Sequence, residues 1–548
     1  MRLGFLLPKL FDLPSAPKKS KATVPSTIAR TPQVQASAGR HYQRRGASNL
    51  GTLSNWPGKV INSILADREK KTVANRAWDL FTNDPMVHGI IKGLMIETIN
   101  TGLSPQAQPM LEWLGKDTEW QSEYKKKAYQ SFQIWGLDPR NFCDAQRRNN
   151  VYMLQALAYF LWRLDGVGIF QTVFRKDPAA PFQFCLLPID PGRMTTPNDL
   201  DAKVDCYNGV VVDSFGAPTS VWLSNVSKGR YASYYGSSNL SQKDCTEYPV
   251  MNKKTGFHNI LLVCEVENIA EYRQDSIITS ITKLCRDRND AMDAAIVKAV
   301  LSNMFVAWMQ DESFQTAGTD WNDRIVELSS GMIFKGAQTE IPPQIISGGD
   351  EPGPALERVM EATQSEAGMA TGRGSENVAK SYKASYSASQ ANIEKSGEVS
   401  AYERSIMVNR FCQPAEMIRQ YECVLNGILP VTNWREFSDP LNLFAYTNTD
   451  WLPPPIRPID KQKYANANDT DLKNKLKTRA TIFGEQNRDW REEMRQSYVE
   501  EDENRKLAAE FGFDLEAQKQ NDAANQSVQQ ALAQLADDIE ELKASTSG

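Results

Sequence analysis

The chain has 548 residues, of which 41% are hydrophobic and 24% charged, and its formal net charge at pH 7 is −5. This length predicts three or four folded units, and the composition excludes both a generally basic nucleic-acid coat and an acidic disordered chain. The charge is unevenly distributed: residues 1–50 hold nine Lys or Arg and one acid, whereas residues 489–548 hold six Lys or Arg and fifteen acids. We therefore expect the two ends to meet different surroundings.

The residue content argues against several structural features. No run of eighteen apolar residues occurs, so the sequence predicts no membrane span, and the first residues are too short an apolar stretch for a signal peptide. Eight scattered cysteines never form a Cys-x-x-Cys pair, which indicates reduced thiols in a protein made in the cytoplasm. The histidines, His41, His88 and His258, lie far apart, which argues against a His-based metal centre or triad.

The first half of the chain predicts helices followed by a β-rich layer. Residues 13–56 are rich in Ser, Ala, Pro, Thr and Gln and are typical of a flexible arm. Apolar residues from Leu80 to Thr98 recur at helical spacing; Asp84 would cap that helix and Pro85 would begin it. Residues 107–165 are expected to be mostly helical. Strands are then predicted at 169–174, 182–187, 209–212 and 221–223, with a hairpin turn at 213–216.

The second half predicts long helices separated by loops. One helix is expected from Asp275 to about Trp308, and another at 355–370 that ends in Gly372-Arg373-Gly374. Short strands and turns are expected at 311–350, a small, polar and basic loop at 375–389, and then helix to about Leu425. Residues 451–455 indicate a rigid extended segment, and the tail from 461 is helical and charged. Apolar residues between 528 and 542 form a two-heptad seam, which fits either a packed helix or a frayed acidic tail.

A search for catalytic patterns finds none with the right context. Gly348-Gly349-Asp350-Glu351 matches the tetrad of cyclic-dinucleotide synthases, but a Pro-Gly-Pro run follows where a strand is needed. The pair Ser280-x-x-Lys283 has the spacing of a serine nucleophile and its lysine, yet it falls within a predicted helix and lacks companion motifs. Gly372-Arg373-Gly374 is too short for a dinucleotide fingerprint and indicates a loop between helices. We predict a protein that is no enzyme and that needs no metal or cofactor.

The order of several segments resembles that of the lambda-type portal proteins of tailed phages. The resemblance begins with residues 76–85 and Thr101-Gly102-Leu103-Ser104-Pro105-Gln106, and continues through residues 186–194 and 208–218. Its most specific part is Ala384-Ser385-Tyr386-Ser387-Ala388-Ser389-Gln390-Ala391, followed by Arg410-Phe411-Cys412-Gln413-Pro414 and by residues 451–461 and 477–478. It covers roughly residues 60–515. This chain departs from the family pattern at Asp165-Gly166-Val167, where a Gly-Glu pair is usual, and at Arg273-Gln274, where the usual Arg-Gly is absent.

The resemblance implies an α+β portal fold, mainly helical with a β-rich wing and clip, in an elongated subunit of a ring. Its parts would be, in chain order, a flexible basic arm at 1–56, a wing at 57–272, a first stem helix at 273–308, a clip at 309–352, a second stem helix at 353–371, a tunnel loop region at 372–392, a long helix and return to the wing at 393–460, and a helical crown with an acidic tail at 461–548.

The function that the resemblance implies is a DNA conduit at one capsid vertex. A ring of twelve copies would pass double-stranded DNA during packaging and ejection, and would bind the terminase motor, the head-tail adaptor and the major capsid or scaffold protein. It would be assembled in the host cytoplasm and reside in the virion, without a membrane partner. The tunnel-loop residues expected to face the DNA are Lys380, Tyr382, Lys383, Ser385, Tyr386 and Ser387. The clip residues expected to contact a partner are Trp308, Phe314 and Trp321.

Alternatives remain open at this point. The loop lysines also fit a mobile loop that they keep soluble, and the clip aromatics also fit a local core. Two other function classes fit the chain: a metal-dependent enzyme that processes nucleotides or DNA with its scattered acids, and a monomeric DNA-binding adaptor that uses the basic arm.

Overall fold

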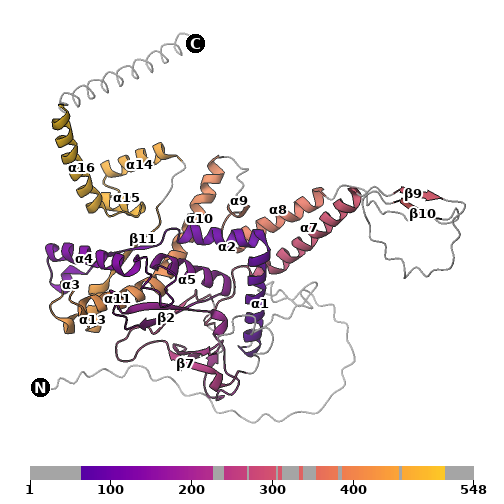
Figure 1. Ribbon diagram of the computed structural model, residues 1–548, viewed down its shortest axis with the longest axis horizontal. Helices are drawn as coiled ribbons and strands as arrows, with labels where there is room; N and C mark the ends of the chain where they lie inside the picture. Colours follow the sequence, from indigo (N-terminus) through magenta and orange to yellow (C-terminus); the bar gives the residue numbers. More distant parts are fainter. Residues whose placement is uncertain are drawn as a thin grey trace, which may run out of the picture. The chain divides into compact units, whose positions relative to one another are not determined.

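A computed structural model describes residues 63–225, 240–267, 269, 271–303, 307–310, 333–336, 353–379, 386–455 and 460–512 (Figure 1). The chain divides into a unit at residues 1–61 and a second unit from residue 62 onward, and all described residues belong to the second. They are mostly helical with small sheets, in agreement with the predicted α+β class. The arm expected at 1–56 lies outside them.

The second unit begins with the predicted helices. Their bounds are α1 Ser63–Asn83, α2 Pro85–Thr98, α3 Leu111–Leu114, α4 Thr118–Gly136 and α5 Val151–Asp165. The start of α2 is as expected: the Asp84 carboxylate accepts hydrogen bonds from the backbone N–H groups of Met86 (2.8 Å) and Val87 (3.3 Å), and Pro85 occupies the first turn. Side-chain capping also starts α4 at Asp117 and α5 at Asn150. These boundaries are set locally by the sequence.

The β-rich layer consists of two antiparallel sheets. In the first, β2 (Gly168–Phe174) pairs with β3 (Phe184–Ile189) on one side and with β8 (Ile260–Val263) on the other. The second has the order β4-β5-β6-β7, with bounds Cys206–Tyr207, Val210–Val212, Pro218–Ser224 and Cys245–Pro249. The predicted turn at 213–216 joins β5 to β6, and the Asp213 carboxylate holds it by accepting from two backbone N–H groups of the turn.

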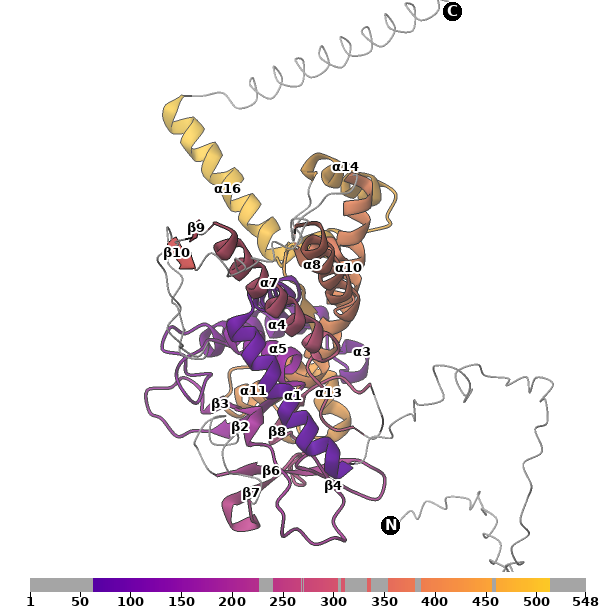
Figure 2. The same ribbon diagram turned by 90° about the vertical axis from the view of Figure 1, so that its right-hand side faces the viewer.

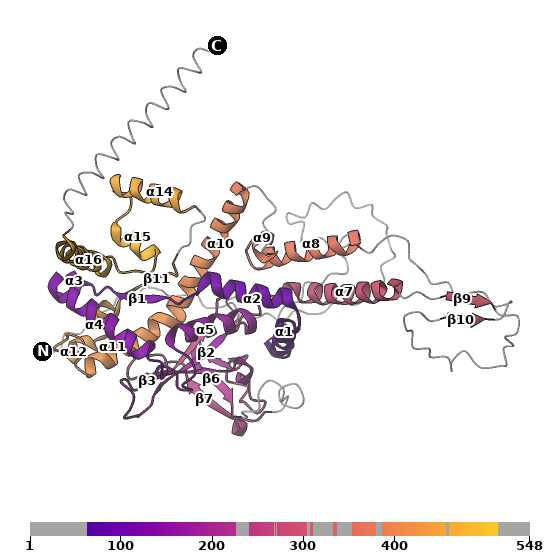
Figure 3. The same ribbon diagram turned by 45° about the horizontal axis from the view of Figure 1, so that its top comes forward.

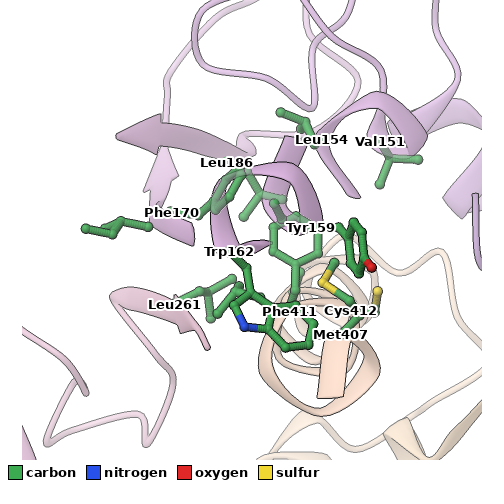
Figure 4. Packing of buried hydrophobic residues seen from close by; sticks show 14 of the residues in the cluster. Val151, Leu154, Tyr159, Trp162, Phe170, Leu186, Leu261, Met407, Phe411 and Cys412 are labelled. Carbon is green, nitrogen blue, oxygen red and sulfur yellow. The ribbon is translucent and has the colours of Figure 1, made fainter. Parts of the chain in front are cut away.

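The core lies where α5, β2 and the segment after α10 meet (Figure 4). Tyr159 and Trp162 of α5 are fully buried, as are Phe170 of β2 and Phe411. The rings of Phe170 and Phe411 are in edge contact, with centroids 4.8 Å apart. Residues far apart in sequence therefore share one apolar core, which ties the second half of the chain to the first.

Two long helices pack side by side (Figures 1 and 2): α7 (Thr282–Asn303) and α8 (Gly353–Ala370). The helix predicted from Asp275 to Trp308 is wrong at both ends. Before α7, the backbone N–H of Ile277 donates to the carbonyl of Arg163 (3.0 Å), and a 3-10 turn follows at Thr279–Ile281, so tertiary contact with α5 delays the helix. After α7, Trp308 lies in strand β9 (Ala307–Gln310), which pairs in parallel with β10 (Ile333–Gly336).

The polar segment predicted as a loop at 375–389 is partly helical. It contains α9 (Ser375–Ala379) and the first residues of α10 (Tyr386–Met407). The helix then continues as a π-helical turn at Val408–Cys412 and as α11 (Gln413–Leu425), which ends where predicted. Pro414 has no N–H to donate to the preceding turn, which accounts for the wider hydrogen-bonding pattern just before it.

The C-terminal part returns to the first helices before it forms a helical end. Its elements are α12 Trp434–Phe437, α13 Pro440–Thr447, β11 Thr449–Leu452, α14 Lys461–Lys473, α15 Arg479–Glu485 and α16 Trp490–Phe511. Strand β11 pairs with β1 (Ser104–Ala107), so the segment predicted to be extended is partly a strand. No residue of α16 is buried. All eight cysteines are free thiols, as predicted.

Candidate functional site

The predicted tunnel-loop residues fall mostly outside the described ranges. Lys380, Tyr382, Lys383 and Ser385 belong to residues 380–385, which the structure does not describe. Tyr386 and Ser387 are the first two residues of α10. The structure therefore places these residues between α9 and α10 but tests no contact of their side chains.

Most of the predicted clip aromatics also fall outside the described ranges. Phe314 and Trp321 lie outside the described residues, as does the tetrad at 348–351. Trp308 is in β9, where its backbone is in register with Phe334 of β10. Their role in binding a partner stays a prediction.

A turn at 371–374 joins α8 to α9, the helix that directly precedes residues 380–385. Gly372 has φ +68°, a conformation that favours glycine. A Cβ at Gly368 would come within 2.7 Å of the backbone N of Ser375, so a side chain there would clash with the returning chain. The sequence identified this Gly-Arg-Gly segment correctly as a loop between helices, but it gave no role to the arginine.

Arg373 fills the centre of this turn and is buried, with 4% of its surface exposed. Its Nη1 pairs with the Glu97 carboxylate of α2 and donates to Ser400 Oγ of α10 (2.8 Å). Its Nη2 donates to the Glu403 carboxylate of α10 (2.8 Å) and to Thr98 Oγ1 of α2 (3.2 Å). One guanidinium thus connects the α8–α9 turn to both α2 and α10. We call this cluster, with Ser396 and Tyr159, the Arg373 hub.

Glu403 is the acidic centre of the hub and is equally buried. Besides Arg373, its carboxylate accepts from the Tyr159 hydroxyl of α5 (2.6 Å) and lies 3.1 Å from Nη2 of Arg163. Ser396 Oγ of α10 donates to Glu97 (2.8 Å). Three helices (α2, α5 and α10) and one turn therefore share a single polar cluster, in which the two carboxylates of Glu97 and Glu403 oppose two guanidinium groups.

The charges of the hub shift the pKa values of its members. Burial disfavours the charged guanidinium of Arg373, but the carboxylates of Glu403 and Glu97 outweigh it, and the pKa of Arg373 rises. Burial and the nearby Glu403 charge raise the pKa of Tyr159. Both groups therefore keep their neutral-pH forms, charged Arg373 and protonated Tyr159, across the physiological range.

Other candidate chemistry has a structural explanation. Lys283 is 90% exposed and pairs with Asp287 one turn along α7 (3.6 Å), and Ser280 lies in the preceding 3-10 turn rather than within the helix. Burial raises the pKa of Cys143 to about 12 and that of Cys285 to about 11, so these thiols stay protonated near neutral pH. Within the described ranges, no group of three or more His, Cys, Asp or Glu could hold a metal ion.

Sequence reasoning missed the residues of the hub. Glu97 and Arg373 are 276 positions apart, so no local spacing announces their pairing. The one available signal is that Glu97 is the sole acid of the α2 sequence, most of which is apolar.

Comparison with known proteins completes the description. A family model described as "Phage portal protein, lambda family" matches residues 54–403, well over half of the chain. The match spans α1 to α9 and ends within α10, at Glu403 of the hub. No protein in a search of curated sequences matches the chain.

Proposed function

Because the chain belongs to the lambda family of phage portal proteins, we propose that it forms the ring at the unique capsid vertex through which DNA passes during packaging and ejection. The family match carries this proposal, because it runs without interruption from α1 through both long helices to the Arg373 hub. The resemblance noted in the sequence is thereby confirmed at the level of the family.

The proposed partners follow from this position in the virion. A homo-oligomeric ring of twelve copies would contact double-stranded DNA in its channel, the terminase motor and then the head-tail adaptor at its clip, and the major capsid or scaffold protein at its wing. It would assemble in the host cytoplasm. None of the helices that the structure describes is both long and apolar enough to cross a membrane.

The predicted parts can be assigned to observed elements. Helices α7 and α8 would be the two stem helices, since they pack together and the residues between them, 309–352, would form the clip. The wing would comprise α1 to α5 and the sheets of β2 to β8. Helices α14 to α16 would begin the crown. The family match at residues 54–403 supports the assignments of the wing, stem and clip, whereas the crown lies beyond that match and rests on the resemblance in the sequence.

The tunnel loop region, at 372–392, would begin at the turn that carries Arg373 and would include residues 380–385. Residues 380–385 lie between α9 and α10, so Lys380 and Lys383 would face DNA phosphates, with Tyr382, Ser385, Tyr386 and Ser387 around them. We expect the double variant Lys380→Ala, Lys383→Ala to retain less DNA in assembled particles. An unchanged length of packaged genome would contradict a role of these lysines in the channel.

The proposed role is structural. The family is structural rather than catalytic, and we infer that this chain has no enzymatic activity of its own; its sequence has no Gly-x-x-x-x-Gly-Lys-[Ser/Thr] motif for ATP. The motor ATPase would be a separate chain.

Electron microscopy of the purified full-length chain tests the proposal directly. Negatively stained rings with an axial hole are the expected result. Particles of monomer size at micromolar concentration, confirmed by mass photometry, would contradict the ring and favour the adaptor class. Metal-dependent turnover of nucleotide or DNA would contradict the structural role.

A further inference from the structure

Helix α2 is held by a charged cluster at each of its ends. Its first turn is capped by Asp84, and its last turn contains Glu97 and Thr98 of the Arg373 hub. The fourteen residues between these ends span about 20 Å at 1.5 Å per residue. Figure 3 shows α2 between the beginning of α7 at one end and α10 at the other. Helix α2 is thus linked at one end to α7 and at the other end to α10.

We call the contacts of Asp84 with Arg288 and Asn289 the first clamp; they join α2 to α7. Asp84 is 1% exposed, and its carboxylate accepts from Arg288 Nη2 (2.6 Å) and from Asn289 Nδ2 (3.2 Å) while it caps the helix. Arg288 is itself buried, at 6% exposure, and its Nη1 contacts the sulfur of Met86. A buried aspartate that both caps α2 and pairs with α7 links the order of one helix to the position of the other.

The second clamp joins α2 to α10 and to the α8–α9 turn through Arg373, as described above. Between the clamps, the inward face of α2 is anchored in the core by the buried side chains of Val87, Ile90, Ile91 and Leu94. A helix that is packed along its length and clamped at both ends moves as one body, because its internal hydrogen bonds resist bending.

We propose that α2 is a rigid link that couples the position of α7 to the order of α9 and the first half of α10, with Arg288 and Arg373 as the positioning residues. A displacement of the N-terminal part of α7 would thereby reach the helices on both sides of residues 380–385. This goes beyond the proposed portal function and does not depend on it, because every contact involved lies within one chain.

Hydrogen exchange read by mass spectrometry on the full-length protein tests this link. The variant Asp84→Asn keeps the helix cap, since Asn caps about as well as Asp, but removes the charge that holds Arg288. We expect amide exchange in 90–98, 375–379 and 386–396 to rise at least about fivefold, the lower bound for coupled sites. Because coupling is reciprocal, Arg373→Gln should raise exchange in residues 282–292 by a similar factor.

Two further variants distinguish coupling through α2 from a general loss of stability. Lys283→Gln removes an exposed ion pair on the same helix and should leave exchange in α2, α9 and α10 within about twofold of the parent. The variant Arg288→Gln should reproduce the effect of Asp84→Asn from the other partner. Faster exchange that stops at α7 and the first turn of α2 would overturn the proposal. Faster amide exchange in α8 and α9 while α2 stays protected would also overturn it, because the coupling would then run through α8. Either result can occur whether or not the chain forms rings.

Discussion

The replacement Arg373→Met tests how strongly the hub holds the proposed tunnel segment. It keeps an unbranched side chain but removes a guanidinium that pairs with Glu403 (2.8 Å), itself only 3% exposed. Breaking a buried pair by removing one partner costs about 3–5 kcal/mol. The cost should lie near the lower end, because Arg163 remains 3.1 Å from Glu403 and Tyr159 still donates to it. Glu97 is 40% exposed, so its lost pairing adds at most about 1 kcal/mol.

We therefore expect α10 to lose about 3 kcal/mol against local opening, which corresponds to roughly a hundredfold faster amide exchange in its peptides. The matched control is Arg404→Met on the neighbouring residue of α10. Burial and the like charge of Arg373 lower the pKa of Arg404, so its removal relieves repulsion and should leave exchange in α10 nearly unchanged.

A double-mutant cycle with Glu403→Gln completes this test. The double variant should cost less than the sum of the single variants by at least about 1 kcal/mol, because neither charge is then buried opposite a missing partner. Exchange in Arg373→Met within fivefold of the parent, or strictly additive costs, would refute the reasoning that the hub anchors α10.

Three further predictions concern positions away from the hub. Gly166→Ala should destabilise the protein by several kcal/mol and reduce the yield of folded chain, because φ is +82° and the new Cβ would lie 1.8 Å from a backbone oxygen; an unchanged thermal midpoint would contradict this. Gly89→Ala and Gly93→Ala should each stabilise α2 by about 0.5–1 kcal/mol, since no atom lies within 4 Å of the added Cβ; a lowered unfolding midpoint would argue against a free face. Iodoacetamide at pH 8 should label the half-buried Cys206 before Cys285, whose pKa burial raises to about 11; mass mapping that finds Cys285 modified first would oppose this order.

Local signals in the sequence were sufficient to predict the elements that neighbouring residues determine. The start of α2 follows from Asp84 and Pro85, whose capping role needs only the adjacent backbone. The strands β2 and β3 follow from runs of apolar, β-branched and aromatic residues, and the turn at Asp213 follows from its turn residues. Such signals also predicted the long helices α8 and α11, which contain apolar residues at helical spacing.

Elements that depend on distant contacts could not be predicted. Helix α9 has only five residues, most of them polar or small, and it is helical where Asn377 donates to the backbone carbonyl of Asn392 on α10 (3.3 Å). The late start of α7 depends on the carbonyl of Arg163, more than a hundred positions earlier. The hub is the extreme case, because its charges are individually unfavourable in a core and become stable only when three helices and the α8–α9 turn bring them together.

The segments at 165–167 and 273–274 meet in space. Arg273 is 3% exposed, its guanidinium lies 3.4 Å from the carbonyl oxygen of Asp165, and its Nη2 is 4.0 Å from the Asp165 carboxylate. Gly166, the next residue, leaves room for the backbone carbonyl of Gln274. Residues 108 positions apart in sequence thus form one buried junction between the end of α5 and the segment that leads into α7. A change at either position alone would leave a buried charge or a clash, so the end of α5 and the segment before α7 depend on each other for their packing.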